Sequence, residues 1–270
     1  MIKHILHAYH VSMRSLVHPI MRMIVLFVAS VAFVASVYGL FAVREANTFQ
    51  VIATCALALI VPIVFFIVQS LAVNYADSAQ PVGAWIGRAF HVFWQLLAIS
   101  VLPILGVWIL AYIADMYWAK VVMDGPGVLG SDATAPHVTM PVAISDLRWQ
   151  EISVVSLRYL LFGFVLPLAL VQLWITVARE GLLNASMTVI RSMRIAFAPQ
   201  TVLTYCVGLL VFAVIPYLLV FTPMHVVNLW WDMILLGSRI VTAVMLCIGG
   251  WIATVGAISV LRSEAYDVRE

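Results

Sequence analysis

Long intervals without a charged residue constrain this chain more than any other feature of its sequence. Six such intervals occur, and each can hold the roughly 20 apolar residues that a helix needs to cross a hydrocarbon core of about 30 Å. The predicted spans lie near residues 21–43, 51–74, 92–114, 153–178, 201–221 and 236–261. Only helices satisfy their own backbone hydrogen bonds over such lengths without alternating polarity. The sequence therefore predicts an all-α polytopic membrane protein with six transmembrane helices.

Composition supports the same class of protein. Hydrophobic residues make up 64% of the 270 residues and charged residues 10%, whereas a soluble domain carries about 25% charged residues. The mean hydropathy is +1.10. The first span is longer than the apolar stretch of a secretory signal, which is about 7–15 residues, so we expect an uncleaved helix. We expect a single integral membrane domain over residues 1–270.

The distribution of basic residues predicts the orientation of the spans. Six spans place both termini on one side of the membrane, and that side carries nine Lys and Arg residues against five on the other. Because basic residues are retained on the cytoplasmic side, we expect both termini to be cytoplasmic. Residues 115–152 are then expected to form an extracytoplasmic loop.

An internal repeat emerges when the chain is shifted by 103 residues. The coinciding pairs are Gln69 with Gln172, Asp77 with Glu180, Arg88 with Arg191, His91 with Arg194, and Trp94 with Phe197. A third, fainter copy begins at Arg14. The predicted unit is a short amphipathic helix followed by two spans, and it occurs twice or three times along the chain.

The segments before the first, third and fifth spans are the predicted amphipathic helices, the first of them over residues 1–20. Six of their basic residues are expected to contact lipid headgroups: Lys3, Arg14, Arg88, His91, Arg191 and Arg194. The apolar face of the first helix is expected to hold Ile5, Leu6, Tyr9, Met13, Leu16, Val17 and Ile20. Such helices lie in the headgroup plane with the apolar face buried about 5–10 Å. Three roles stay open: a connector that shapes the fold, contact with lipid or substrate, and docking of a partner.

Two glutamines, Gln69 and Gln172, are the intramembrane polar residues that coincide in the repeat. They are expected to form hydrogen bonds between helices, each contributing about 1 kcal/mol. Four prolines interrupt the spans: Pro62, Pro103, Pro167 and Pro216. Broken helices in matching halves can mark the midplane site of a transporter, so a site between these helices is the alternative interpretation.

No motif predicts catalysis. The chain has no nucleophile elbow, phosphate-binding loop, zinc-protease helix or haem-attachment motif. His4, His7 and His10 are not accompanied by a carboxylate, so we interpret them as interfacial polar residues and not as metal ligands. The three cysteines fall inside predicted spans without disulfide or zinc spacing. We therefore expect no enzyme, no catalytic or metal site, no cofactor and no nucleic-acid partner.

The segments Arg88-Ala-Phe-His91-Val-Phe-Trp94 and Arg191-Ser-Met-Arg194-Ile-Ala-Phe197 match one another, with Arg14-Ser15 as a weaker third copy. In these segments and in its spans the chain resembles a bacterial group of six-span proteins. The group includes the membrane domain attached to some glycerophosphodiester phosphodiesterases and related uncharacterised inner-membrane proteins. These 270 residues contain no counterpart of the catalytic phosphodiesterase domain, so no activity follows from the resemblance. It implies the six-span fold and a location in a bacterial cytoplasmic (inner) membrane, as a multi-pass protein.

Together these observations lead to one expected function and one alternative. We expect a non-enzymatic integral membrane scaffold or accessory subunit of a larger membrane complex, whose basic interfacial helices contact anionic lipid. The expected partners are membrane lipids and other membrane-protein subunits. The alternative is a transporter or lipid-handling protein with a polar, water-accessible cavity inside the bundle. Gln69, Gln172 and the proline-broken spans would line that cavity.

Overall fold

The computed structural model describes residues 2–17, 20–43, 47–75, 81–123, 144–222 and 229–267. All regular structure within these residues is helical, and six helices are long and apolar enough to cross a membrane. These helices are Ile20–Ala42, Thr48–Asn74, Val82–Tyr117, Ile152–Glu180, Pro199–Phe221 and Trp230–Ser263. The prediction of an all-α polytopic protein with six spans is confirmed.

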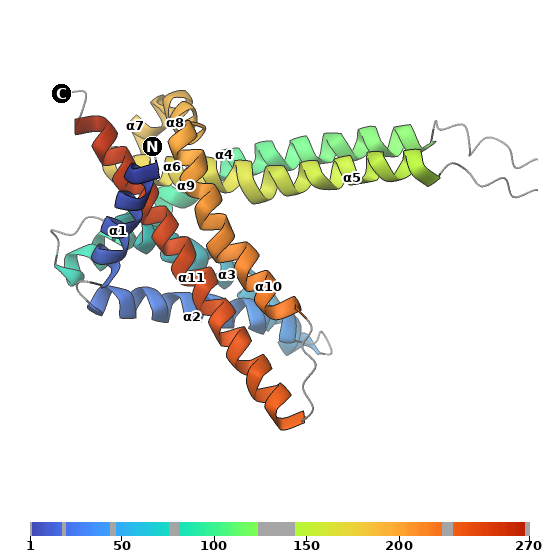
Figure 1. Ribbon diagram of the computed structural model, residues 1–270, viewed down its shortest axis with the longest axis horizontal. Helices are drawn as coiled ribbons and strands as arrows, with labels where there is room; N and C mark the ends of the chain where they lie inside the picture. Colours follow the sequence, from blue (N-terminus) through green and yellow to red (C-terminus); the bar gives the residue numbers. More distant parts are fainter. Residues whose placement is uncertain are drawn as a thin grey trace, which may run out of the picture. The chain divides into compact units, whose positions relative to one another are not determined.

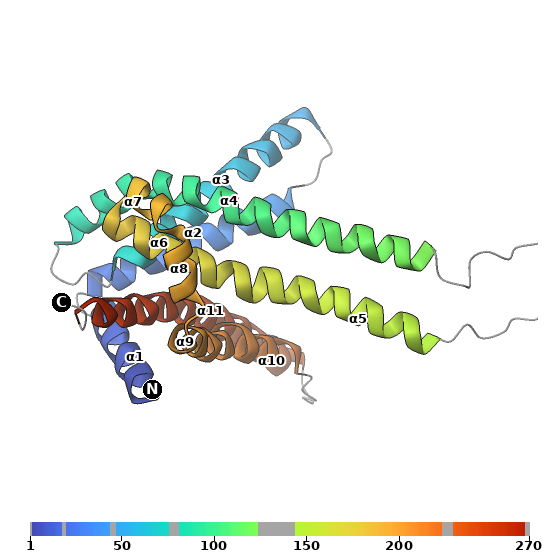
Figure 2. The ribbon, with the colours of Figure 1, turned by 90° about the horizontal axis from the view of Figure 1, so that it is seen from above.

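Figures 1 and 2 show how the described helices are ordered along the chain. In order, they are α1 (Ile2–Val17), α2 (Ile20–Ala42), α3 (Thr48–Asn74), α4 (Val82–Met123), α5 (Ile144–Leu160), η1 (Leu161–Val165), α6 (Leu166–Glu180), α7 (Leu182–Met187), α8 (Val189–Ala196), α9 (Pro199–Leu209), η2 (Leu210–Val214), α10 (Ile215–Phe221) and α11 (Leu229–Asp267). Two compact units result: residues 1–99 with 171–270, and residues 100–170.

The segment 115–152 contains more helix than a loop would. Helix α4 continues to Met123 and α5 begins at Ile144, so helical structure enters the segment from both ends. Within the second unit the two helices run side by side (Figures 1 and 2), and Arg158 of α5 forms an ion pair with Asp115 of α4. The remaining residues of this segment, 124–143, lie outside the described residues, as does Asp77 of the predicted repeat.

Two prolines follow π-helical turns. The five-residue turns η1 and η2 each end two residues before a proline, Pro167 and Pro216. A proline ring inside an α-helix clashes with the carbonyl four residues earlier, and a wider turn relieves that clash. Pro62 and Pro103, in contrast, lie inside continuous α-helices.

Helix α1 packs along α11 in the first unit (Figures 1 and 2). Its buried residues recur at helical spacing: Ile5, Ala8, Ser12 and Leu16. Leu6, Met13 and Val17 of the expected apolar face are instead exposed. The expected apolar face of the N-terminal helix is thus divided between an internal seam and an outer surface.

Small residues of α11 allow its neighbours to approach closely. A Cβ on Gly256 would overlap the Tyr75 hydroxyl and lie 2.5 Å from Ser12 Oγ. The Ser12 hydroxyl donates to the carbonyl of Ala253 at 2.9 Å, and the Tyr75 hydroxyl donates to that of Ile252 at 3.1 Å. Helices α1 and α3 are therefore joined to α11 by buried polar contacts that only a glycine there accommodates.

Candidate functional site

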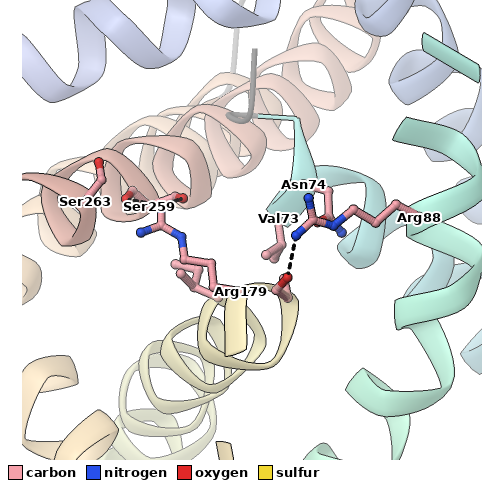
Figure 3. Close-up of a pocket in the computed structure, with 8 residues that line it drawn as sticks. Val73, Asn74, Arg88, Arg179, Ser259 and Ser263 are labelled. Carbon is pink, nitrogen blue, oxygen red and sulfur yellow. Dashed lines mark hydrogen bonds between the residues drawn. The ribbon is translucent and has the colours of Figure 1, made fainter. Parts of the chain in front are cut away.

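A pocket of about 350 Å³ lies where α3, α4, α6 and α11 come together in the first unit (Figure 3). Its polar side chains come from all four helices: Asn74, Arg88, Arg179, Ser259 and Ser263. Its apolar wall is formed by Val73, Ile175 and Ala178. The residues from α3 belong to the last turn of that helix and those from α6 to its last two turns, so the pocket lies at the level where two spans end.

Helix α6 lies at the centre of the helices that surround the pocket. Every residue from Val171 to Ala178 is buried, because other helices surround this part of α6 on all sides. A helix that is apolar nearly all round is typical of such a central position. The polar exceptions, Gln172 and Thr176, and the following Arg179 are consequently held between neighbouring helices.

Arg88 reaches from α4 to the end of α6. Its Nη2 donates to the carbonyl of Ala178 at 2.9 Å, and the side chain is partly buried (Figure 3). The last carbonyls of a helix have no partner within the helix, and the helix dipole favours a cation there. Arg88 therefore stabilises the end of α6 and brings a positive charge to the pocket.

Arg179 reaches from α6 to α11. Its Nη2 lies 3.0 Å from the carbonyl oxygen of Ser259 and 3.1 Å from the hydroxyl of the same residue. Figure 3 shows this guanidinium and that of Arg88 on either side of the pocket. Two guanidinium groups thus face one small volume, which is an arrangement suited to an anion.

A buried arginine, Arg262, joins α11 to α6 in the same unit. Its side chain is 2% exposed, and its Nη1 donates to the Gln172 carbonyl at 3.0 Å, the Gln172 Oε1 at 3.3 Å and the Thr176 hydroxyl at 2.6 Å. Its Nη2 lies 3.6 Å from the Glu180 carboxylate. A charge removed from water needs both an ion partner and hydrogen bonds, and these contacts supply them.

A second buried arginine, Arg22 of α2, binds the end of α3. Its Nη1 donates to the Tyr75 carbonyl at 3.1 Å, and its guanidinium lies 5.9 Å from the centre of the Trp85 ring. The acceptors of Arg22 and Arg88, at Tyr75 and Ala178, are 103 residues apart, which is the shift of the predicted repeat. Two helix ends that the predicted repeat would make equivalent therefore receive an arginine each.

The six residues predicted to contact headgroups occupy separate surfaces. Arg88 lines the pocket, whereas His91 is exposed on the next turn of α4. Lys3 and Arg14 are exposed on α1, and Arg191 and Arg194 are exposed on α8. The structure brings only Arg88 of the six to the pocket.

The two predicted intramembrane glutamines are both buried in contacts between helices. Gln69 accepts a hydrogen bond from Trp251 Nε1 at 2.9 Å, and Gln172 accepts from Arg262. Neither glutamine lines the pocket at the helix ends. They join α3 and α6 to α11.

Sequence reasoning missed most of the pocket. Asn74, Arg179, Ser259 and Ser263 were not singled out, although each lies near the end of a predicted span. A signal was present: arginine, serine and asparagine at the ends of three different spans are candidates for a common polar site when these ends lie on one side.

The short helices α7 and α8 form a second candidate surface. They turn away from α6 at Gly181, whose φ of 81° favours glycine. Ser192 Oγ lies 3.0 Å from the Thr176 hydroxyl, and Ala185, Ser192 and Ala196 are buried. The large apolar side chains face outward instead. Those of Leu183, Met187 and Ile190 are 77%, 84% and 87% exposed.

A cleft of about 360 Å³ occurs separately in the second unit. It is lined by Trp108, Ala111, Tyr112, Asp115, Arg158 and Phe162. Its charged residues, Asp115 and Arg158, form an ion pair with each other, and Trp108 stacks on Tyr112 at 6.0 Å. The cleft therefore has an aromatic wall, and its two charged side chains neutralise each other.

Comparisons with known proteins give no match. No family model matches the chain, no curated protein matches it, and no solved structure matches its fold. The resemblance to the six-span bacterial group stays a prediction. The geometry of the helix ends and of α7–α8 is therefore what carries the functional argument.

Proposed function

We propose that this chain is a non-enzymatic integral membrane scaffold or accessory subunit that organises anionic lipid at the inner face of a bacterial cytoplasmic membrane. The observation that carries the proposal is the outward face of α7–α8. Leu183, Met187 and Ile190 are each more than three-quarters exposed and lie beside the exposed Arg191 and Arg194.

An apolar stripe of this kind is unfavourable in water. The segment packs on the protein through small residues, so its bulky side chains are available to an apolar medium. A helix with this distribution lies in the headgroup plane, with its apolar face in the acyl region and its basic side chains among phosphates. Each basic residue near an anionic leaflet contributes about 1 kcal/mol to that attachment. The surface therefore supports contact with anionic lipid.

The proposal is tested by substituting the stripe, with Leu183, Met187 and Ile190 all replaced by Ser. Native mass spectrometry would count the lipids retained when the protein is released from nanodiscs containing anionic and zwitterionic phospholipid. A matched control replaces Leu59, Leu102 and Ile104, which are also exposed but lie within other spans. Loss of anionic lipid in the stripe variant alone supports the proposal. Equal retention by both variants contradicts it.

The accessory-subunit part of the proposal has its own test. Mild detergent extraction from native membranes should recover this protein with other subunits at fixed stoichiometry. Isolation of the chain alone, with its anionic lipid retained, would reduce the proposal to a lipid-organising scaffold.

The transporter alternative is favoured by one observation, the two π-helical turns before Pro167 and Pro216. Such turns are frequent at functional sites. The glutamines expected to line a transport site, Gln69 and Gln172, are instead engaged by Trp251 and Arg262. The scaffold is for this reason the function that we put first.

A further inference from the structure

We propose that the pocket between α3, α4, α6 and α11 binds the headgroup of an anionic phospholipid that carries hydroxyl groups and no amine, as a phosphoglycerol headgroup does. This inference rests on the proposed function, because it assumes that the protein retains anionic lipid. It adds a defined site and a headgroup chemistry.

The first step is charge. Arg88 and Arg179 bring two guanidinium groups to a volume of about 350 Å³. No acidic residue is among the described residues that line it. Guanidinium groups match the oxygens of a phosphate in charge and planar geometry. A headgroup with an ammonium group would place a third cation beside these two, so the pocket discriminates against ethanolamine and similar headgroups.

The second step is position. The α6 span ends at Glu180 and the α11 span ends at Ser263, and the pocket is lined by residues next to both ends. This is the depth of phosphates in a bilayer, so a lipid can place its phosphate in the pocket while its acyl chains stay in the hydrocarbon layer. The volume falls within the range of about 300–1,000 Å³ of small-molecule sites and suits a headgroup better than a whole lipid.

The third step is the neutral polar lining. Ser259 Oγ accepts a hydrogen bond from Arg179, so its own proton is available to a ligand oxygen. Ser263 Oγ donates to the Val260 carbonyl and can accept from a ligand hydroxyl. Asn74 is buried, and its Nδ2 donates to the Ser70 carbonyl, which fixes the orientation of its amide. A ligand hydroxyl can both accept from Ser259 and donate to Ser263, whereas an ionised phosphate oxygen can only accept.

The experiment measures which lipid the detergent-solubilised full chain retains. The protein is equilibrated with equal amounts of phosphatidylglycerol, phosphatidate and phosphatidylethanolamine, and bound lipid is counted by native mass spectrometry. The proposal expects at least fivefold preference for phosphatidylglycerol over each of the others. Parallel samples with glycerol 3-phosphate and with inorganic phosphate distinguish a lipid site from a site for a soluble phosphate. Displacement of the lipid by millimolar glycerol 3-phosphate would assign the site to a soluble ligand and overturn the lipid assignment.

Variants assign the binding to the pocket. The double variant Arg88→Gln/Arg179→Gln should lose the preference for phosphatidylglycerol over phosphatidate and phosphatidylethanolamine. The variant Arg191→Gln/Arg194→Gln on α8 should bind less anionic lipid in total but keep that preference. The variant Ser259→Ala/Ser263→Ala preserves the charges and should lose only the preference for phosphatidylglycerol over phosphatidate. An unfolding temperature of Arg88→Gln/Arg179→Gln in detergent equal to that of the wild type would show that its change in lipid binding does not reflect misfolding.

The outcomes separate this inference from the proposed function. If Arg88→Gln/Arg179→Gln keeps the preference for phosphatidylglycerol, the pocket is not the site, while a preference for anionic lipid in the wild type still supports the proposed function. If phosphatidate binds as well as phosphatidylglycerol, the recognition of hydroxyl groups is overturned. If phosphatidylethanolamine binds equally, both the inference and the proposed function fall.

Discussion

The hydroxyl oxygen of Ser12 lies 2.6 Å from that of Tyr75, and both reach α11 at a point where Gly256 carries no side chain. Residues 63 positions apart thus meet on a helix from the other end of the chain. The N-terminal helix is held to the first unit by this buried contact as well as by its apolar residues. Its docking should therefore depend on a single glycine.

Gly256→Ala should detach or displace α1. The added Cβ would overlap Tyr75 Oη and lie 2.5 Å from Ser12 Oγ, and overpacking of this kind costs about 1–3 kcal/mol. A lower thermal unfolding temperature in detergent, together with faster proteolysis near residue 12, would show the effect. Gly249→Ala is the matched control. Gly249 also lies on α11, but a Cβ added there would meet no atom within 4 Å. Equal unfolding temperatures for the two variants would contradict the prediction.

High pH should also release α1. Burial raises the pKa of Tyr9 and of Tyr75 above the usual value of 10.0, so the folded protein holds both phenols neutral. Their contribution to stability is complete below about pH 10 and decreases as pH rises, because the unfolded chain then ionises first. Unfolding followed by circular dichroism between pH 8 and 11.5 measures this decrease. The variant Tyr9→Phe/Tyr75→Phe should unfold at higher pH than the wild type; an unchanged profile would assign the transition to other groups.

Arg262→Gln should destabilise the protein strongly. The change removes the charge that faces Glu180 and disturbs the hydrogen bonds to Gln172 and Thr176, and breaking a buried pair costs about 3 kcal/mol. Unfolding in mixed micelles of increasing sodium dodecyl sulfate measures the free energy. Glu180→Gln should cost less, because the Glu180 carboxylate is 30% exposed and 3.6 Å away, and Arg262 keeps its hydrogen bonds to Gln172 and Thr176 in that variant. The reverse order would mean that Glu180, and not the α6 hydrogen bonds, is the main partner of Arg262.

The six spans could be predicted because hydrophobic length depends on local sequence alone. The positions of Arg22 and Arg262 could not. Both stand at the ends of apolar intervals, where a charge normally reaches water, yet the two side chains are buried against α3 and α6. Their acceptors are 53 and 90 residues away, and no periodicity within one helix encodes such a pairing.

The N-terminal helix illustrates the same limit. Its amphipathic pattern predicts an apolar face, but the pattern does not distinguish a face that meets lipid from one that meets another helix. Ser12 is buried on the internal seam, whereas Leu6 is 64% exposed. From hydrophobicity alone, Leu6 would be expected to be buried and Ser12 to be exposed. The small size of Ser12 and Gly256, which permits close approach of helices, decides the outcome.

Arg194→Ala should reduce the retention of anionic lipid more than Arg191→Ala does. Arg194 follows Met187 and Ile190 at helical spacing, so its guanidinium continues the exposed apolar stripe of α7–α8 and extends along it to the phosphates. Arg191 lies on the neighbouring polar face. A contribution of about 1 kcal/mol corresponds to a roughly fivefold loss of bound anionic lipid, which native mass spectrometry can measure. Equal and negligible losses in the two variants would leave α8 as a connector that only shapes the fold.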